Sequence, residues 1–118
     1  MEDGSFGYTV ERSVVRFFGA DAISVSHAVY TFLEDAGYVF DFYGSFAPAE
    51  VKLDSLTGRT VRPRARYRGI RQHVNFPMDI SSYPIDEAKA YLDQLLRMRF
   101  NKLSIHDIYV KIVNFRCF

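Results

Sequence analysis

Residues 13–43 have the sequence SVVRFFGADAISVSHAVYTFLEDAGYVFDFY and pass from a strand pattern to a helix pattern and back. Residues 13–18 are rich in β-branched and aromatic side chains, which favours a strand that ends at Gly19. Apolar residues then recur every three or four positions, which predicts an amphipathic helix. Those positions are Val25, Ala28, Val29, Phe32, Leu33 and Ala36. Residues 38–43 again favour a strand.

Local signals mark both ends of this helix. Asp21 or Ser24 is expected to cap its start, because short polar side chains accept hydrogen bonds from the first free backbone N–H groups. Gly37 stands where a left-handed C-terminal cap is expected. Residues 6–10 favour a further strand ahead of residues 13–18. Strands covered by one helix predict a small α+β layer.

The second half of the chain has a different order of elements. Residues 44–66 form a turn-rich connection, with a possible short strand at 51–53. Residues 66–74 favour a strand, Pro84 is expected as the first residue of a helix, and residues 102–110 favour a last strand. The expected buried stripe of that helix is Ile85, Ala88, Leu92, Leu95 and Leu96.

The two halves together predict an α+β fold. We expect a small antiparallel or mixed sheet covered by a helix in residues 1–58. In residues 59–118 we expect a strand–helix–strand unit with a right-handed parallel crossover, which resembles the start of a (β/α)8 barrel. Two strands cannot close such a barrel, which needs about 250 residues.

The composition is that of a folded chain with balanced charge. Of the 118 residues, 48% are hydrophobic, enough for a core, and 15 basic and 14 acidic residues leave a net charge of +1. That balance predicts neither a nucleic-acid nor a membrane partner. Cys117 is the single cysteine, and no Cys/His spacing suggests a metal or cofactor site. No secretory signal is visible, and no apolar run approaches the roughly 20 residues of a membrane span.

Several short motifs occur in a suggestive order. Residues 27–38 read HAVYTFLEDAGY, Tyr67-Arg68-Gly69 lies at the start of the predicted strand 66–74, and a pattern of Met, Asn, Leu and His follows the second helix. That pattern consists of Met98, Asn101, Leu103 and His106. In these features the chain resembles the β-N-acetylhexosaminidases and the related α-glucuronidase-like glycoside hydrolases. RGIRQHVNFPMD, residues 68–79, is more similar to the α-glucuronidase-like branch.

The chain also departs from this family. Hexosaminidases usually have a second histidine two places before the one matching His106, and Ser104 stands there. Residues 110–118, VKIVNFRCF, match nothing expected in the family. The resemblance implies an accessory α+β domain followed by a (β/α)8 barrel that hydrolyses O-glycosidic bonds. It also implies a parent enzyme that is secreted or periplasmic.

The resemblance implies substrate-binding residues but no catalytic ones. The paired carboxylates of such enzymes come from later strands, so none of the 14 acidic residues is assigned a catalytic role. Arg68 is expected to hold sugar hydroxyls, because a guanidinium offers several donors in a rigid fork. His73 and His106, at the ends of the predicted strands, are the other candidates for substrate contact. No metal or cofactor is implied, and the expected partner is a carbohydrate.

Other interpretations stay open at this point. Arg68 is one of six arginines in residues 59–71, and a solvated face would explain them. His106 could be satisfied by local hydrogen bonds alone. The chain could instead be a free-standing module that binds a partner or a polysaccharide. The same arginines with Tyr67 suggest nucleic-acid binding, but the rest of the chain is not basic. We also expect self-association through exposed strand edges.

Overall fold

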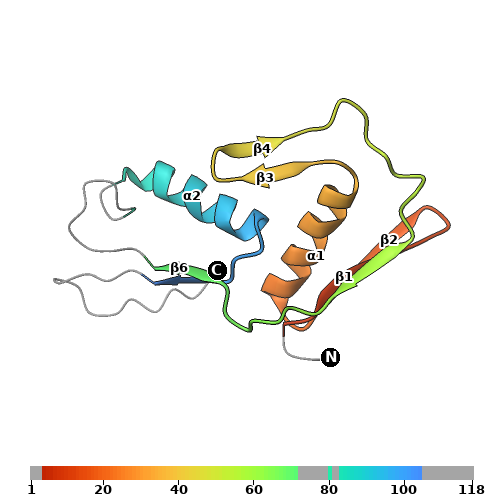
Figure 1. The fold of residues 1–118 in the computed structure, drawn as a ribbon, viewed down its shortest axis with the longest axis horizontal. Coiled ribbons are helices and arrows are strands. Elements are labelled where there is room, and N and C mark those ends of the chain that lie inside the picture. Colours follow the sequence, from red (N-terminus) through yellow and green to blue (C-terminus); the bar gives the residue numbers. More distant parts are fainter. Residues whose placement is uncertain (1–3, 72–79, 81–82, 105–118) are drawn as a thin grey trace.

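The computed structural model describes residues 4–71, 80 and 83–104, and within them the fold is α+β as predicted (Figure 1). The elements are β1 (Phe6–Glu11), β2 (Val14–Gly19), α1 (Ala22–Asp35), β3 (Val39–Asp41), β4 (Gly44–Phe46), β5 (Gly58–Val61), β6 (Gly69–Arg71), α2 (Ile85–Arg97) and β7 (Lys102–Ser104). Neither helix in this part of the chain is long and apolar enough to cross a membrane.

The first layer is an antiparallel sheet with the strand order β2-β1-β5, and α1 packs on one face of it. Tyr8 and Phe17 lie on that face and contact Phe32 of α1 edge to face, with ring centroids 5.2 and 5.7 Å apart. Phe6 and Tyr8 are almost completely buried. The expected layer of strands under a helix is therefore confirmed, and aromatic side chains form its core.

β5 was not predicted, since its residues lay in the expected turn-rich connection. It pairs with the outer edge of β1 and straddles the expected boundary between residues 58 and 59. Gly7 permits this approach, because a Cβ atom there would lie 2.2 Å from the backbone oxygen of Arg59. A four-residue strand that begins with glycine shows too little alternation of apolar and polar residues to be recognised in the sequence. It is stabilised by its hydrogen bonds to β1.

The cap predictions for α1 are confirmed. The Asp21 side chain accepts a hydrogen bond of 2.7 Å from the backbone N–H of Ser24, which also lowers the pKa of Asp21. Gly37 has a φ of 109° at the other end. The chain then returns as the hairpin β3–β4, of which β4 was not predicted. The possible strand at residues 51–53 does not form.

The strand–helix–strand unit is present, and its two strands are parallel as predicted. Gly69 pairs with Lys102 and Arg71 with Ser104. Strands were expected at residues 66–74 and 102–110, of which 72–74 and 105–110 lie outside the described residues. Pro84 is the N-cap of α2 rather than its first helical residue.

The expected buried stripe on α2 is only partly confirmed. Leu95 is buried, Ala88, Leu92 and Leu96 are half-buried, and Ile85 is exposed. The first turn of α2 extends beyond the hairpin β3–β4 and α1, so that within the described part of the chain these elements cover only its later turns (Figure 1).

Candidate functional site

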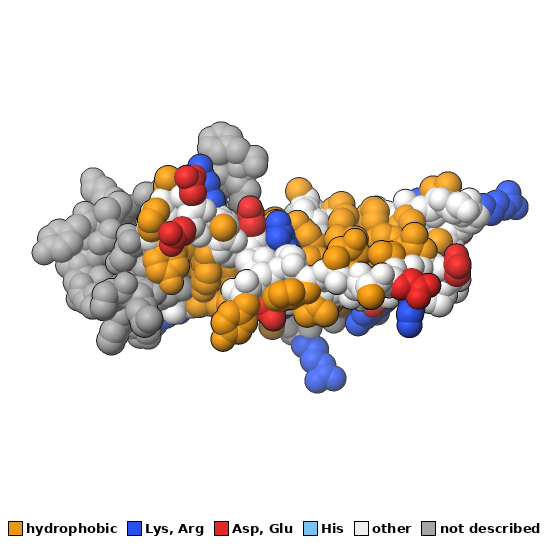
Figure 2. Space-filling model, turned by 90° about the horizontal axis from the view of Figure 1, so that it is seen from above, with side chains coloured by type: hydrophobic (Ala, Val, Ile, Leu, Met, Phe, Trp, Pro, Cys, Tyr) orange, Lys and Arg blue, Asp and Glu red, His pale blue; other side chains and the backbone are white. Residues whose placement is uncertain are grey.

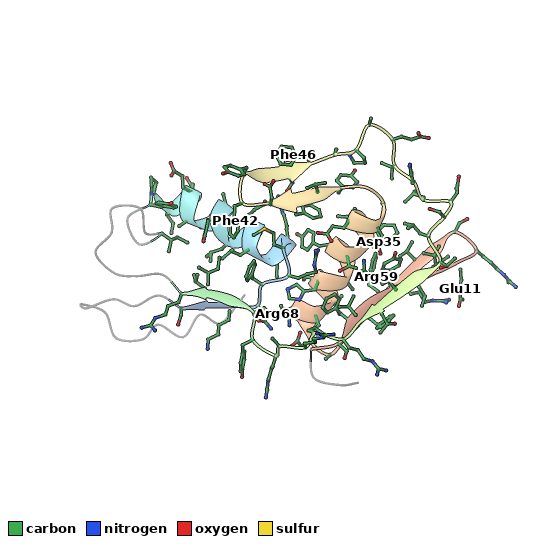
Figure 3. All side chains as sticks on the ribbon, in the orientation of Figure 1. Glu11, Asp35, Phe42, Phe46, Arg59 and Arg68 are labelled. Atoms are coloured by element: carbon green, nitrogen blue, oxygen red, sulfur yellow. The ribbon has the colours of Figure 1, made fainter. Side chains whose placement is uncertain are left out.

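Arg68 lies in the link between β5 and β6, where three parts of the fold meet (Figure 3). Its Nε donates to the carbonyl oxygen of Arg99 at 3.0 Å, and one terminal nitrogen donates to that of Ala65 at 2.8 Å. The other terminal nitrogen is 3.4 Å from Nδ1 of His27 on α1. Arg68 therefore connects α1 and its own link with the turn that follows α2.

His27 is the buried partner in this network, with 1% of its surface exposed. Its Nε2 lies 3.2 Å from the carbonyl oxygen of Phe100, which can only accept, so Nε2 carries the hydrogen. The unprotonated Nδ1 then accepts from Arg68. Burial, followed by the positive charges of Arg68 and Arg99, lowers the pKa of His27 to about 4 although the Phe100 hydrogen bond raises it. His27 is neutral at physiological pH.

Asn101 holds Arg68 from the backbone side. The Asn101 side-chain oxygen accepts from the Arg68 backbone N–H at 2.7 Å, and its amide nitrogen donates to the carbonyl oxygen of Arg66 at 2.8 Å. The backbone N–H of Asn101 donates in turn to the carbonyl oxygen of Arg68 at 2.8 Å. These three bonds set the pairing of β6 with β7, because Asn101 immediately precedes β7. The motif asparagine thus has an observed structural role.

Arg99 closes the network on the side of α2. It has a φ of 65°, and its N–H bonds to the carbonyl oxygen of Leu96, so it ends the helix in the left-handed conformation usually taken by glycine. Its guanidinium pairs with Glu34 of α1. Since its carbonyl oxygen also binds Arg68, one residue ties α1, α2 and the link together.

A hollow of about 460 Å³ lies beside this network. It is lined mainly by apolar side chains together with the two arginines, namely Phe6, Val61, Pro63, Arg68, Met98, Arg99 and Phe100. A guanidinium has five N–H donors. Within the described residues three donors of Arg68 are used, and the same side chain lines the hollow.

The carboxylates near the sheet are engaged in structural pairs. Asp35 at the end of α1 accepts from the Tyr8 hydroxyl at 2.7 Å and from Arg59 at 2.8 Å (Figure 3). Burial, then the bond to Asp35, raises the pKa of Tyr8 to about 12. In the described part of the chain no group of three or more His, Cys, Asp or Glu side chains could hold a metal ion. Glu34 and Asp35 are each held in an ion pair with an arginine, so neither is free to act as a general acid or base.

The arginines of residues 59–71 lie in different surroundings. Arg59 pairs with Asp35, and Arg68 points toward His27. The guanidinium carbon of Arg66 lies 5.3 Å from the centre of the Tyr67 ring, and Nζ of Lys102 lies 5.0 Å from it. The ring of Tyr67, which together with the arginines suggested nucleic-acid binding, is thus already in contact with two cations.

The structure places one of the three predicted site residues. Arg68 is in the network above, while His73 and His106 lie outside the described residues. Sequence reasoning missed His27 and treated Asn101 only as part of a motif. No sequence signal marked His27. Ser24, His27 and Thr31 share one face of the predicted helix, and a polar face predicts exposure, yet all three are buried.

Comparisons of the chain with protein-family models, with curated proteins and with solved structures found no match.

Proposed function

We propose that this chain is the N-terminal, non-catalytic part of a glycoside hydrolase of the α-glucuronidase-like or hexosaminidase-like kind. Residues 1–58 would be its accessory α+β layer, and residues 59–118 would carry the first strand–helix–strand unit of a barrel. The substrate would be a carbohydrate. Arg68 would contact it; the resemblance also implies contacts from His73 and His106, which lie outside the described residues.

The parallel unit β6–α2–β7, fastened to the α+β layer, is the observation that carries this proposal. The accessory layer provides His27 and Glu34, and the unit provides Arg68 and Arg99. A barrel preceded by an accessory domain needs such a junction, because its first strand must start at a defined place. The motif residues Arg68 and Asn101 both belong to it.

The hollow beside Arg68 supports a contact with a saccharide. Its aromatic and aliphatic lining suits the C–H face of a sugar ring, and the guanidinium of Arg68 on its wall suits the sugar hydroxyls. Arg68 precedes β6, whereas catalytic groups of (β/α)8 barrels lie at the carboxyl ends of the strands. A sugar held there would therefore be bound and not cleaved.

Titration of the chain with oligosaccharides that contain glucuronic acid or N-acetylglucosamine, followed by NMR, tests this proposal. Signals of Phe6, Met98 and Phe100 should shift on binding. Arg68→Lys keeps the charge but loses the rigid fork, so binding should weaken at least tenfold. Arg64→Lys is the matched control, since Arg64 is exposed in the same stretch and does not line the hollow. Saccharide binding that Arg68→Lys leaves unchanged, or no binding by any of these sugars, would contradict the proposal.

A further inference from the structure

The hairpin β3–β4 and the segment after it expose a group of large apolar side chains. This group, called the hairpin surface below, consists of Val39, Tyr43, Phe46, Val51 and Leu53. Phe42 is also partly exposed, but its ring contacts Phe100 on the helix side of the hairpin. Tyr43 at the turn is 96% exposed, and Phe46 is 51% exposed. Figure 2 shows hydrophobic side chains gathered on the side of the molecule that carries the hairpin.

The register of the hairpin explains why one of its faces is open. Phe40 and Ser45 are paired and point toward the helices, where Phe40 contacts Tyr30 and Ser45 bonds to Gln94. Val39 and Phe46 are the next pair, so they point to the opposite face. Their exposure follows from the alternation of side chains along a strand.

The hairpin is held in a fixed position. The side-chain amide of Gln94 donates to the carbonyl oxygen of Gly44 at 2.7 Å, and Arg97 donates to the Ser45 hydroxyl at 2.9 Å. Gln94 is buried in α2. An isolated two-stranded hairpin is marginally stable, so this anchoring presents the surface in one conformation.

The exposed apolar area agrees with the size of a protein interface. At about 200 Å² for each aromatic side chain, the exposed parts of Tyr43 and Phe46 amount to about 300 Å². Val39, Val51 and Leu53, each about half exposed, add to this. A standard interface buries about 800 Å² per partner, of which about 500 Å² is apolar.

We propose that a second copy of this chain covers the hairpin surface. The two hairpins would pack face to face about a two-fold axis, with Val39 and Phe46 of one copy against those of the other. Such a contact uses the same patch on each copy and closes at two copies. The net charge of +1 opposes this association only weakly. The proposal goes beyond the glycoside hydrolase assignment and does not depend on it.

Sedimentation equilibrium from low to high micromolar concentration tests this proposal. The wild-type chain should be a dimer at the upper end, and Phe46→Lys should weaken dimerisation more than tenfold. Val14→Lys is the matched control: Val14 is exposed to a similar extent but lies on β2 in the other sheet. Circular dichroism of each variant checks that the fold is retained.

Three outcomes would overturn the proposal. The first is a wild-type chain that stays monomeric at high micromolar concentration. The second is association that Phe46→Lys leaves unchanged and Leu103→Lys removes, which would place the contact at β6–β7. The third is open-ended association into larger species, because a two-fold contact stops at the dimer.

Discussion

Acid should destabilise this chain through His27. The unfolded chain binds a proton at this histidine near its ordinary pKa of 6.5, whereas the folded chain does so only near 4. Between these values the unfolded state holds more protons than the folded state. The stabilisation is therefore complete above pH 6.5 and is lost as the pH falls toward 4.

The structure sets the size of this effect. A proton on Nδ1 of His27 would face the Arg68 guanidinium 3.4 Å away, in a site that is 1% exposed to solvent. Each pH unit between the two pKa values costs about 1.4 kcal/mol, so the total loss lies between about 3 and 4 kcal/mol. A small domain is stable by only about 5–15 kcal/mol, and a loss of that size is easily measured.

Urea unfolding of the wild-type chain and of His27→Gln, at several values between about pH 7.5 and 4.5, measures the effect. Glutamine can donate to the carbonyl oxygen of Phe100 and accept from Arg68, but it does not titrate. As the pH falls over this range, the free energy of unfolding should decrease in both proteins. The decrease should be smaller in the variant, by at least about 2 kcal/mol. His73, His106 and the carboxylates are common to both proteins, so the difference reports His27. Equal pH dependence in the two proteins would refute the assigned role of His27.

The remaining predictions concern a turn and the missing chemistry. Arg12 and Ser13 form the two-residue turn between β1 and β2 with φ values of 46° and 67°, which asparagine and glycine adopt more easily. Replacing both as Arg12→Asn and Ser13→Gly should raise the free energy of unfolding by about 1 kcal/mol, and an unchanged or lower melting temperature would argue against strain in this turn. The purified chain should not hydrolyse aryl glycosides, because the described residues place no free acid/base pair. Turnover that persists through purification and disappears in Arg68→Ala would show that it is an enzyme by itself.

Much of the fold could be predicted because its signals are local. The apolar spacing of α1, its Asp21 cap and Gly37 at its end are readable in about 17 consecutive residues, the length of a typical helix with its caps. The parallel pairing of β6 with β7 followed from the order strand, helix, strand. Arg68 was predicted as a site residue because it belongs to a sequence motif. The structure shows which groups it contacts, among them His27 and the carbonyl oxygen of Arg99.

The amino-acid sequence by itself determined the two helices, the strands β1 and β2 and the α+β class, since these depend on periodicity and caps within one segment. Tertiary structure alone decided β4, β5 and the burial of His27. β5 exists because Gly7 allows the backbone of Arg59 to approach β1, and β4 because Gln94 holds Gly44. The pKa of His27 is lowered by its burial and by the charges of Arg68 and Arg99, which are at least 41 residues away along the chain. Such contacts between distant segments leave no periodic trace in the sequence.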